Sequence, residues 1–159
     1  MTKPVVEKPD IPPEYGNPTK RLEWADVERK LESASAYWIA STRPDGRPHV
    51  IPRDGVWFDG GLYYGGSEKT VHYRNIIRNP QVVVHIGDGQ EAIIVEGAVE
   101  VEKPTEEMAA RLADKMFAKY PQYGRIEPSM YMGGVSVLRP RRVLAWTTFA
   151  ENATRFTFD

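Results

Sequence analysis

The chain of 159 residues contains no cysteine, which excludes disulfide bridges, thiolate nucleophiles and cysteine-ligated zinc sites. No stretch approaches the roughly 18 apolar residues of a membrane-spanning helix. The first residues, MTKPVVEKPDIPPEYGNP, lack the apolar run of a signal peptide. The 21 basic and 22 acidic residues nearly cancel, and no basic stripe with interleaved aromatics occurs. We therefore expect a cytoplasmic protein with neither a membrane nor a nucleic-acid partner.

The sequence also lacks the common hydrolase and metallopeptidase motifs, because neither G-x-S-x-G nor H-E-x-x-H occurs. Its three histidines, His49, His72 and His85, fall in separate predicted elements without the spacing of metal ligands. We therefore expect no metal site, and we interpret His85, in an apolar strand, as structural. The residue pattern alone identifies no catalytic residue.

The length and the character of the N-terminus predict one domain preceded by an arm. A chain of this length can bury one hydrophobic core, and no internal repeat occurs. Residues 1–18 are rich in proline and charge, which predicts a flexible or surface-draped arm. The single domain is expected over residues 19–159. It begins with a helix over LEWADVERKLES, for which Thr19 is the predicted cap.

Three strands with two tight turns are predicted after this helix. The strands lie in AYWIAST, RPHVIPRDGVWF and LYYGG, and the turns lie in RPDG and DGG. An Asp-Gly pair between apolar segments is a strong hairpin signal. Pro48 and Pro52 cannot donate to a β-ladder, so the second strand is predicted at a sheet edge, bent or bulged.

A hairpin, a helix and two closing strands complete the pattern. The segments QVVVHIG and AIIVEGAVEVE flank an Asp-Gly turn, and Val95, Gly97 and Val99 share one face of the second strand. A helix follows Thr105, its predicted cap, and GVSVLRPRRVLAWTTF and ATRFTFD are predicted strands. The sequence therefore predicts a mainly β fold, with six to eight antiparallel strands closing as a small barrel and about three flanking helices.

The segment GGSEKTVHYRNIIRNP combines a glycine turn, hydroxyls and cations between two predicted strands. Ser67 is the predicted cap of a helix that starts at Glu68. The free N–H groups at such a start, with Lys69, Thr70 and His72 nearby, are suited to a phosphate. The alternative interpretation is an ordinary surface helix with its cations in water.

The order of these motifs resembles the pyridoxamine 5′-phosphate oxidase-like family of split β-barrels. The resemblance is carried by ASTRPDGRPHVIP, WFDGGLYYGG, YRNIIRNPQVVVHI, IIVEGAVEV and LRPRRVLAWTTF, within residues 35–149. Each motif is weak alone, but the joint order and spacing are specific. The resemblance implies a split barrel that forms a homodimer, with flavin mononucleotide (FMN) or the deazaflavin F420 bound between the subunits.

The resemblance also implies which residues bind the cofactor. In the family the phosphate is held around the start of the helix before the R-N pair, and the strand after the P-H-V turn runs along the ring system. The candidates for the phosphate are Thr70, Arg74 and Asn75, which match directly, and Ser67, Lys69 and His72. The candidates for the ring are Val50, Ile51, Pro52 and Arg53. Trp146 matches an aromatic near the cofactor groove, or else it packs in the core.

Two departures from the family pattern leave the cofactor open. Val71 and His72 stand where many relatives carry consecutive cations, and Val71 cannot bind phosphate. The pair Arg53-Asp54 stands where relatives often carry apolar residues. This pair either contacts the ring edge or substrate, or it is solvated at the rim of the barrel.

We therefore expect an FMN-binding oxidoreductase that transfers hydride or electrons to or from a small organic substrate. One alternative is an F420-dependent reductase, whose longer anionic tail would use Arg53, Arg141 and Arg142 as further cations. The other alternative is not an enzyme. It is a barrel that binds a cofactor or haem for storage or sensing, or one that has lost its ligand.

Overall fold

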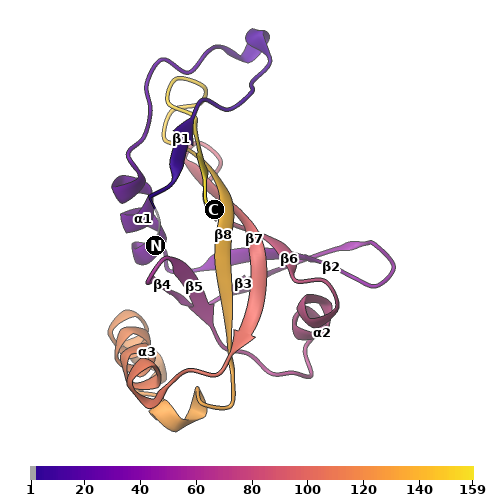
Figure 1. Cartoon of the computed structure of the whole chain (residues 1–159), viewed down its shortest axis with the longest axis vertical. Helices are drawn as coiled ribbons and strands as arrows, with labels where there is room; N and C mark the ends of the chain where they lie inside the picture. The colour runs from indigo at the N-terminus through magenta and orange to yellow at the C-terminus, as the bar shows by residue number, and fades with distance from the viewer. Residues whose placement is uncertain (1–2) are drawn as a thin grey trace.

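The computed structural model describes residues 3–159 as one nine-stranded antiparallel sheet with three flanking α-helices (Figure 1). The main path of the sheet runs β1-β9-β8-β7-β6-β2-β3, and β5 pairs with both β4 and β8. The strands are β1 (Val5–Glu7), β2 (Tyr37–Thr42), β3 (Pro48–Arg53), β4 (Val56–Phe58), β5 (Gly61–Tyr64), β6 (Gln81–Gly87), β7 (Ala92–Glu102), β8 (Val135–Trp146) and β9 (Thr154–Thr157). The helices are α1 (Trp24–Ser33), α2 (Val71–Arg78) and α3 (Glu106–Lys119), with short 3-10 turns at Pro13–Tyr15, Pro121–Tyr123 and Pro128–Met130. The predicted mainly β fold with flanking helices is confirmed.

The strand count exceeds the predicted six to eight for two reasons. The arm predicted for residues 1–18 contains β1, which pairs with β9 at one end of the sheet. The predicted strand RPHVIPRDGVWF was wrong as a single element, because the chain breaks into β3 and β4 at Asp54-Gly55. A Cβ at Gly55 would lie 2.8 Å from the Tyr63 carbonyl oxygen, so glycine permits the close passage of β5 there. The predicted edge position of β3 is confirmed, since it ends the main path of the sheet.

Two helices begin later than predicted. Helix α1 starts at Trp24, because the Thr19 backbone N–H donates to the Glu151 carbonyl (2.8 Å) instead of opening a helix. The predicted Ser67 cap was also wrong. Helix α2 starts at Val71, and Thr70 caps it by accepting the Tyr73 N–H (3.2 Å). The predicted Thr105 cap of α3 is confirmed by its bond from the Met108 N–H (3.2 Å).

The hydrophobic core lies against the sheet in two clusters. In the first, Leu31 of α1 packs with Ile39 of β2 and Val84 of β6. In the second, Leu112 of α3 packs with Phe58 of β4. In Figure 1, α1 and α3 lie to the left of the long strand β8 and α2 lies to its right. Helix α2 therefore stands apart from the other two helices, and the candidate site lies beside it.

A glycine bulge explains the V-E-G motif of β7. The register of β7 against β8 shifts between Glu96 and Gly97. A Cβ at Gly97 would lie 2.1 Å from the Arg139 carbonyl oxygen, so any side chain would force the two backbones apart. The motif therefore has a structural role, which is to let β8 approach β7 at the bulge.

Candidate functional site

The candidate site lies where the end of β3, the link after β5 and the start of α2 meet. Arg53 comes from β3, Tyr64 from β5 and His72 from the first turn of α2. The Arg53 guanidinium donates a hydrogen bond to the Gly65 carbonyl oxygen. A Cβ on Gly66 would lie 2.7 Å from Arg53 Nη2. Because Gly66 has no side chain, the Arg53 guanidinium can occupy this space. The backbones of Gly65 and Gly66 are not left-handed.

His72 is buried and neutral. Its side chain is only 4% exposed, and the Tyr64 hydroxyl lies 3.0 Å from its Nε2. Burial raises the pKa of Tyr64, so the phenol stays protonated, and the tautomer of His72 decides which of the two atoms donates. Burial lowers the pKa of His72 to about 4, and the positive charge of Arg53 and the nearby His49 lower it too. The neutral ring therefore has one N–H and one acceptor nitrogen, and its Nδ1 is the nitrogen that faces away from Tyr64.

Asn75 and Ser41 form buried hydrogen bonds next to the site. The Asn75 side-chain amide donates to Ser41 Oγ (3.1 Å), and both residues are buried. Ser41 Oγ in turn lies 3.4 Å from the His49 carbonyl oxygen. These bonds tie α2 to β2 and β3. The Asn75 amide nitrogen therefore helps to position α2 on the sheet.

Three buried polar atoms of this region lack a hydrogen-bond partner among residues 3–159. They are His49 Nδ1, Arg53 Nε and His72 Nδ1, and only one other buried side-chain atom of the described residues, the Tyr131 hydroxyl, shares this property. A buried polar atom without a partner costs about 1 to 3 kcal/mol relative to a paired one. Three such atoms in one cluster are typical of a place where a ligand or water supplies the partners.

The remaining phosphate candidates lie on the surface. Lys69 is exposed and makes no ion pair within residues 3–159, while Arg74 Nη1 donates to the Lys69 carbonyl oxygen (2.8 Å). The Thr70 hydroxyl donates to the Ser67 carbonyl oxygen (2.9 Å), and Ser67 Oγ accepts the Lys69 N–H (3.2 Å). The two hydroxyls thus shape the turn before α2, and the cations lie around its rim.

The ring candidates on β3 split between two faces of the strand. Ile51 and Arg53 are half-buried on the side of α2, while Val50 and Pro52 are exposed on the other side. A flat ligand cannot touch all four side chains on one face. Since β3 pairs only with β2 among the described strands, its other edge leaves backbone groups available to a ligand.

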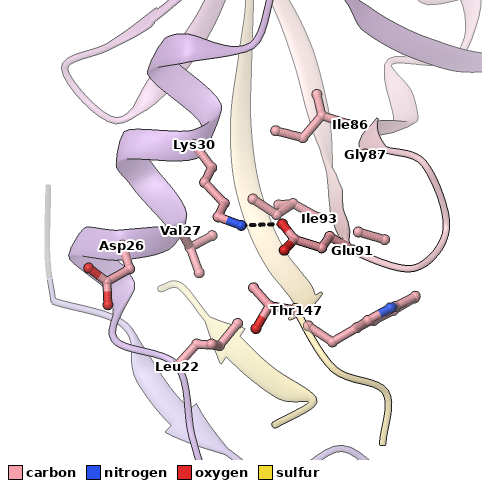
Figure 2. A pocket seen from close by; sticks show the side chains of 11 residues that line it. Leu22, Asp26, Val27, Lys30, Ile86, Gly87, Glu91, Ile93 and Thr147 are labelled. Carbon is pink, nitrogen blue, oxygen red and sulfur yellow. Dashed lines mark hydrogen bonds and ion pairs between the residues drawn. The ribbon is translucent and has the colours of Figure 1, made fainter.

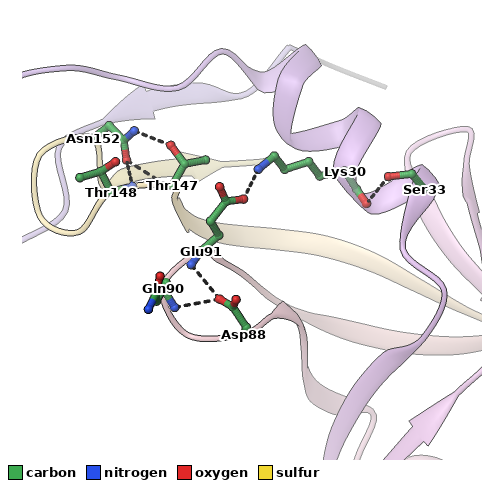
Figure 3. Close-up of polar contacts among 8 residues, drawn as sticks. All are labelled: Lys30, Ser33, Asp88, Gln90, Glu91, Thr147, Thr148 and Asn152. Atoms are coloured by element: carbon green, nitrogen blue, oxygen red, sulfur yellow. Dashed lines mark hydrogen bonds and ion pairs between the residues drawn. The ribbon is translucent and has the colours of Figure 1, made fainter.

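Trp146 lies at a different place, on the wall of an apolar cavity of about 70 Å³ between α1 and the β6–β7 turn. Figure 2 shows the ion pair of Lys30 and Glu91 across this cavity. Figure 3 shows how Asp88 Oδ1 holds the turn by accepting the N–H groups of Gln90 (3.0 Å) and Glu91 (3.2 Å). Trp146 Nε1 donates to the Gly89 carbonyl oxygen (3.3 Å). One protomer therefore does not bring Trp146 to Arg53 and His72.

The outer face of β3, β2 and β6 is apolar and exposed. Strand pairing places Val50, Ala40 and Val83 in one row across the three strands, and Pro52, Trp38 and His85 in the next row. Trp38 is 45% exposed and Val50 is 51% exposed. A flat apolar surface of this kind is typical of a contact with another protein chain. We call these six residues the outer patch.

Two classes of site are absent from residues 3–159. No three histidine, aspartate or glutamate side chains lie close enough together to hold a metal ion. None of the helices in these residues is both long and apolar enough to cross a membrane.

Solved structures share this fold. A conserved hypothetical protein from Mycobacterium tuberculosis has a TM-score of 0.66 at 22% identity, with 80% of this chain and 89% of that chain covered. A haem-binding protein from Mycobacterium smegmatis also has a TM-score of 0.66, at 18% identity, with 86% of this chain and 59% of that chain covered. An F420 reductase has a TM-score of 0.54 at 29% identity, with 73% of this chain and 94% of that chain covered.

Sequence comparison gives the family. A search of curated proteins gives no match. The sequence model described as pyridoxamine 5′-phosphate oxidase matches residues 24–147, which is most of the chain and includes every residue of the candidate site. The chain therefore belongs to the pyridoxamine 5′-phosphate oxidase-like family, as its motifs predicted.

Proposed function

We propose that the protein is an FMN-dependent oxidoreductase that acts on a small organic substrate. The observation that carries this proposal is the cluster of unpartnered polar atoms formed by His49, Arg53 and His72 beside the start of α2. Membership of the family supports a flavin or deazaflavin as the ligand. The cluster has the chemistry of a site for one phosphate group.

Arg53 and His72 are suited to complementary tasks on that phosphate. The Arg53 guanidinium carries a permanent charge, and its Nε and Nη groups can bind two phosphate oxygens in parallel. His72 Nδ1 would donate a further hydrogen bond, and the N–H groups at the start of α2 favour an anion. This arrangement replaces the consecutive cations of the family pattern at Val71 and His72 with one arginine from β3 and a neutral donor.

The free edge of β3 is proposed to bind the ring system. A bound flavin supplies hydride transfer at its ring N5, so the chain needs to position the ring and not to carry the redox chemistry itself. Backbone groups of β3 offer donors and acceptors along the ring edge, except at Pro48 and Pro52, which lack an N–H. Ile51 would support the ring from the side of α2.

A homodimer is proposed to form through the outer patch. The patch includes the exposed face of β3, while Arg53 lies on the opposite face, so a second copy packed there would adjoin the free edge of β3 that is proposed to bind the ring. Trp38 and Val83 are exposed in one chain, and their burial in a dimer would remove apolar surface from water.

F420 is the second candidate cofactor, because an F420 reductase is 29% identical over 73% of this chain. The positions of Arg141 and Arg142 do not favour their predicted role as cations for the longer anionic tail of F420. Arg141 and Arg142 lie on β8, which β7, β6 and β2 separate from β3 in the sheet, and Arg142 is paired with Glu96 (2.6 Å). A single phosphate, as in FMN, therefore fits one protomer better.

A cofactor titration tests the proposal. Protein purified from a host that lacks F420 would be titrated separately with FMN, F420 and haemin while its visible spectrum is recorded. We expect saturable binding of FMN, followed by turnover of photoreduced FMN with small organic acceptors. Binding of F420 alone would replace the proposal with the reductase. Binding of haemin alone, or of nothing, would reject both enzyme assignments.

A further inference from the structure

A second cavity, separate from the proposed cofactor site, contains a lysine that the proposed function does not use. The cavity has a volume of about 340 Å³ and lies between α1, β4 and the end of α3. Its lining residues are Glu32, Val56, Trp57, Lys115, Ala118 and Lys119. This cavity is open to solvent, so a small molecule can reach its wall directly.

Two fixed acceptors orient the amine of Lys119. Nζ donates to the Tyr37 hydroxyl (2.8 Å) and to the Gly55 carbonyl oxygen (3.0 Å). Tyr37 is fully buried, and its own hydroxyl donates to the Leu31 carbonyl. Gly55 is held by Tyr120, whose hydroxyl donates to the same carbonyl (3.0 Å). The Tyr37 hydroxyl and the Gly55 carbonyl oxygen are therefore held in place, and together they fix the orientation of the Lys119 amine.

These two hydrogen bonds leave one tetrahedral position of Lys119 Nζ without a hydrogen-bond partner. A neutral primary amine has two N–H groups and one electron pair. Both N–H groups of Lys119 are satisfied by Tyr37 and Gly55, and no further acceptor for Nζ is found among residues 3–159. The electron pair then occupies the free position, beside the cavity that Lys119 lines.

The surroundings of Lys119 also make the neutral form of its amine more common than it is for a lysine in water. Burial lowers the pKa of Lys119 from 10.5 to about 8, against the opposing charges of Asp54 after β3 and Glu32 of α1. The other groups that face it are the rings of Tyr37 and Tyr120, 4.7 Å and 5.6 Å from Nζ, and Lys115 on its own helix. At pH 7.5 about a quarter of the Lys119 amine would be neutral, compared with about one in a thousand for an ordinary lysine.

We propose that Lys119 is the nucleophile of a second site, where it forms an imine with small uncharged aldehydes. The Nζ electron pair forms a bond to the carbonyl carbon, and the carbonyl π pair moves to oxygen. One amine proton moves to that oxygen, which gives a carbinolamine. The carbinolamine oxygen takes a second proton from solvent and leaves as water while the C=N bond forms, so amine, aldehyde and one proton give the protonated imine and water with no change in oxidation state. The protonated imine keeps one N–H for Tyr37 or Gly55. Because Glu32 and Lys115 carry opposite charges on the wall, an uncharged aldehyde fits best.

Reductive labelling tests this site in the native protein. The protein would be treated with limiting propanal and cyanoborohydride between pH 6.5 and 10, and peptide mass spectrometry would give the labelling rate of each lysine. We expect Lys119 to react at least tenfold faster than Lys115 at pH 7.5, with a rate that reaches half its maximum near pH 8. The same reaction in urea should remove the difference, since the unfolded chain has no cavity.

Two variants complete the test. Lys103→Arg changes an exposed lysine that does not line the cavity, and it should leave the labelling of Lys119 unchanged. Lys119→Arg keeps a positive charge and should abolish the fast reaction without moving it to another lysine. Equal native rates at Lys119 and Lys115, or a fast reaction that survives Lys119→Arg, would overturn the proposal. Neither outcome depends on whether the protein binds FMN.

Discussion

Replacement of Arg53 by alanine is expected to weaken FMN binding by roughly 10- to 150-fold. The variant removes the one permanent charge that the structure places within the cluster, beside His72. A hydrogen bond to a charged group contributes about 1.5 to 3 kcal/mol, which corresponds to that change in affinity. Fluorescence titration of FMN against each purified protein measures the effect directly.

Two controls separate a role in phosphate binding from a general loss of structure. Riboflavin lacks the phosphate, so its affinity should change by less than about threefold in Arg53→Ala. Lys69→Ala removes an exposed cation at the rim and should leave FMN affinity within about threefold of the native value. If Arg53→Ala binds FMN as tightly as the native protein, or loses riboflavin to the same extent, Arg53 does not hold the phosphate.

Acidification from pH 6.5 to pH 4 is expected to destabilise the ligand-free protein through His72. Burial lowers the pKa of this histidine from 6.5 in the unfolded chain to about 4 in the folded protein. In that window the unfolded state binds more protons than the folded state, so stability falls as the pH falls. The contribution is fully present above pH 6.5 and lost below pH 4. It amounts to at most about 3 kcal/mol.

Urea unfolding at pH 7, 5.5 and 4.5 measures this dependence. His72→Gln cannot titrate, so its free energy of unfolding should fall less steeply over the same range. His85→Gln changes an exposed histidine of β6 and should keep the native pH dependence. Saturating FMN should flatten the native curve, because a phosphate beside His72 favours its protonated form. Equal slopes for the native protein and His72→Gln would show that His72 is not the buried neutral group described here.

The sequence predicted the strands well because their local signals agree with the final packing. The period of two in β7 and the Asp-Gly turn before it concern neighbouring residues only, and both survive in the structure. The break at Gly55 escaped prediction because it depends on the approach of β5, a contact made only after folding. The start of α2 was equally undetermined, since Ser67 and Thr70 are both good caps and the bond between Asn75 and Ser41 fixes the helix on β2.

The candidate site was only partly predictable for the same reason. His72 was assigned from its place before the R-N pair, and the structure brings it to the cluster. Arg53 was expected beside the ring, but its guanidinium lies near Gly65 and Gly66. Tyr64 was missed, because only the pairing of β5 shows that its hydroxyl reaches His72. Lys119 was missed too, since a lysine at the end of a helix gives no signal that distinguishes a half-buried amine from a solvated one.

The affinity of the native protein for FMN relative to riboflavin tests the central claim most directly. The two ligands share the ring system and differ in the phosphate, which is the group that Arg53 and His72 are proposed to hold. We predict that FMN binds at least about tenfold more tightly than riboflavin at neutral pH. Equal affinities would contradict the account, because the cluster of unpartnered polar atoms would then contribute nothing to binding of the cofactor.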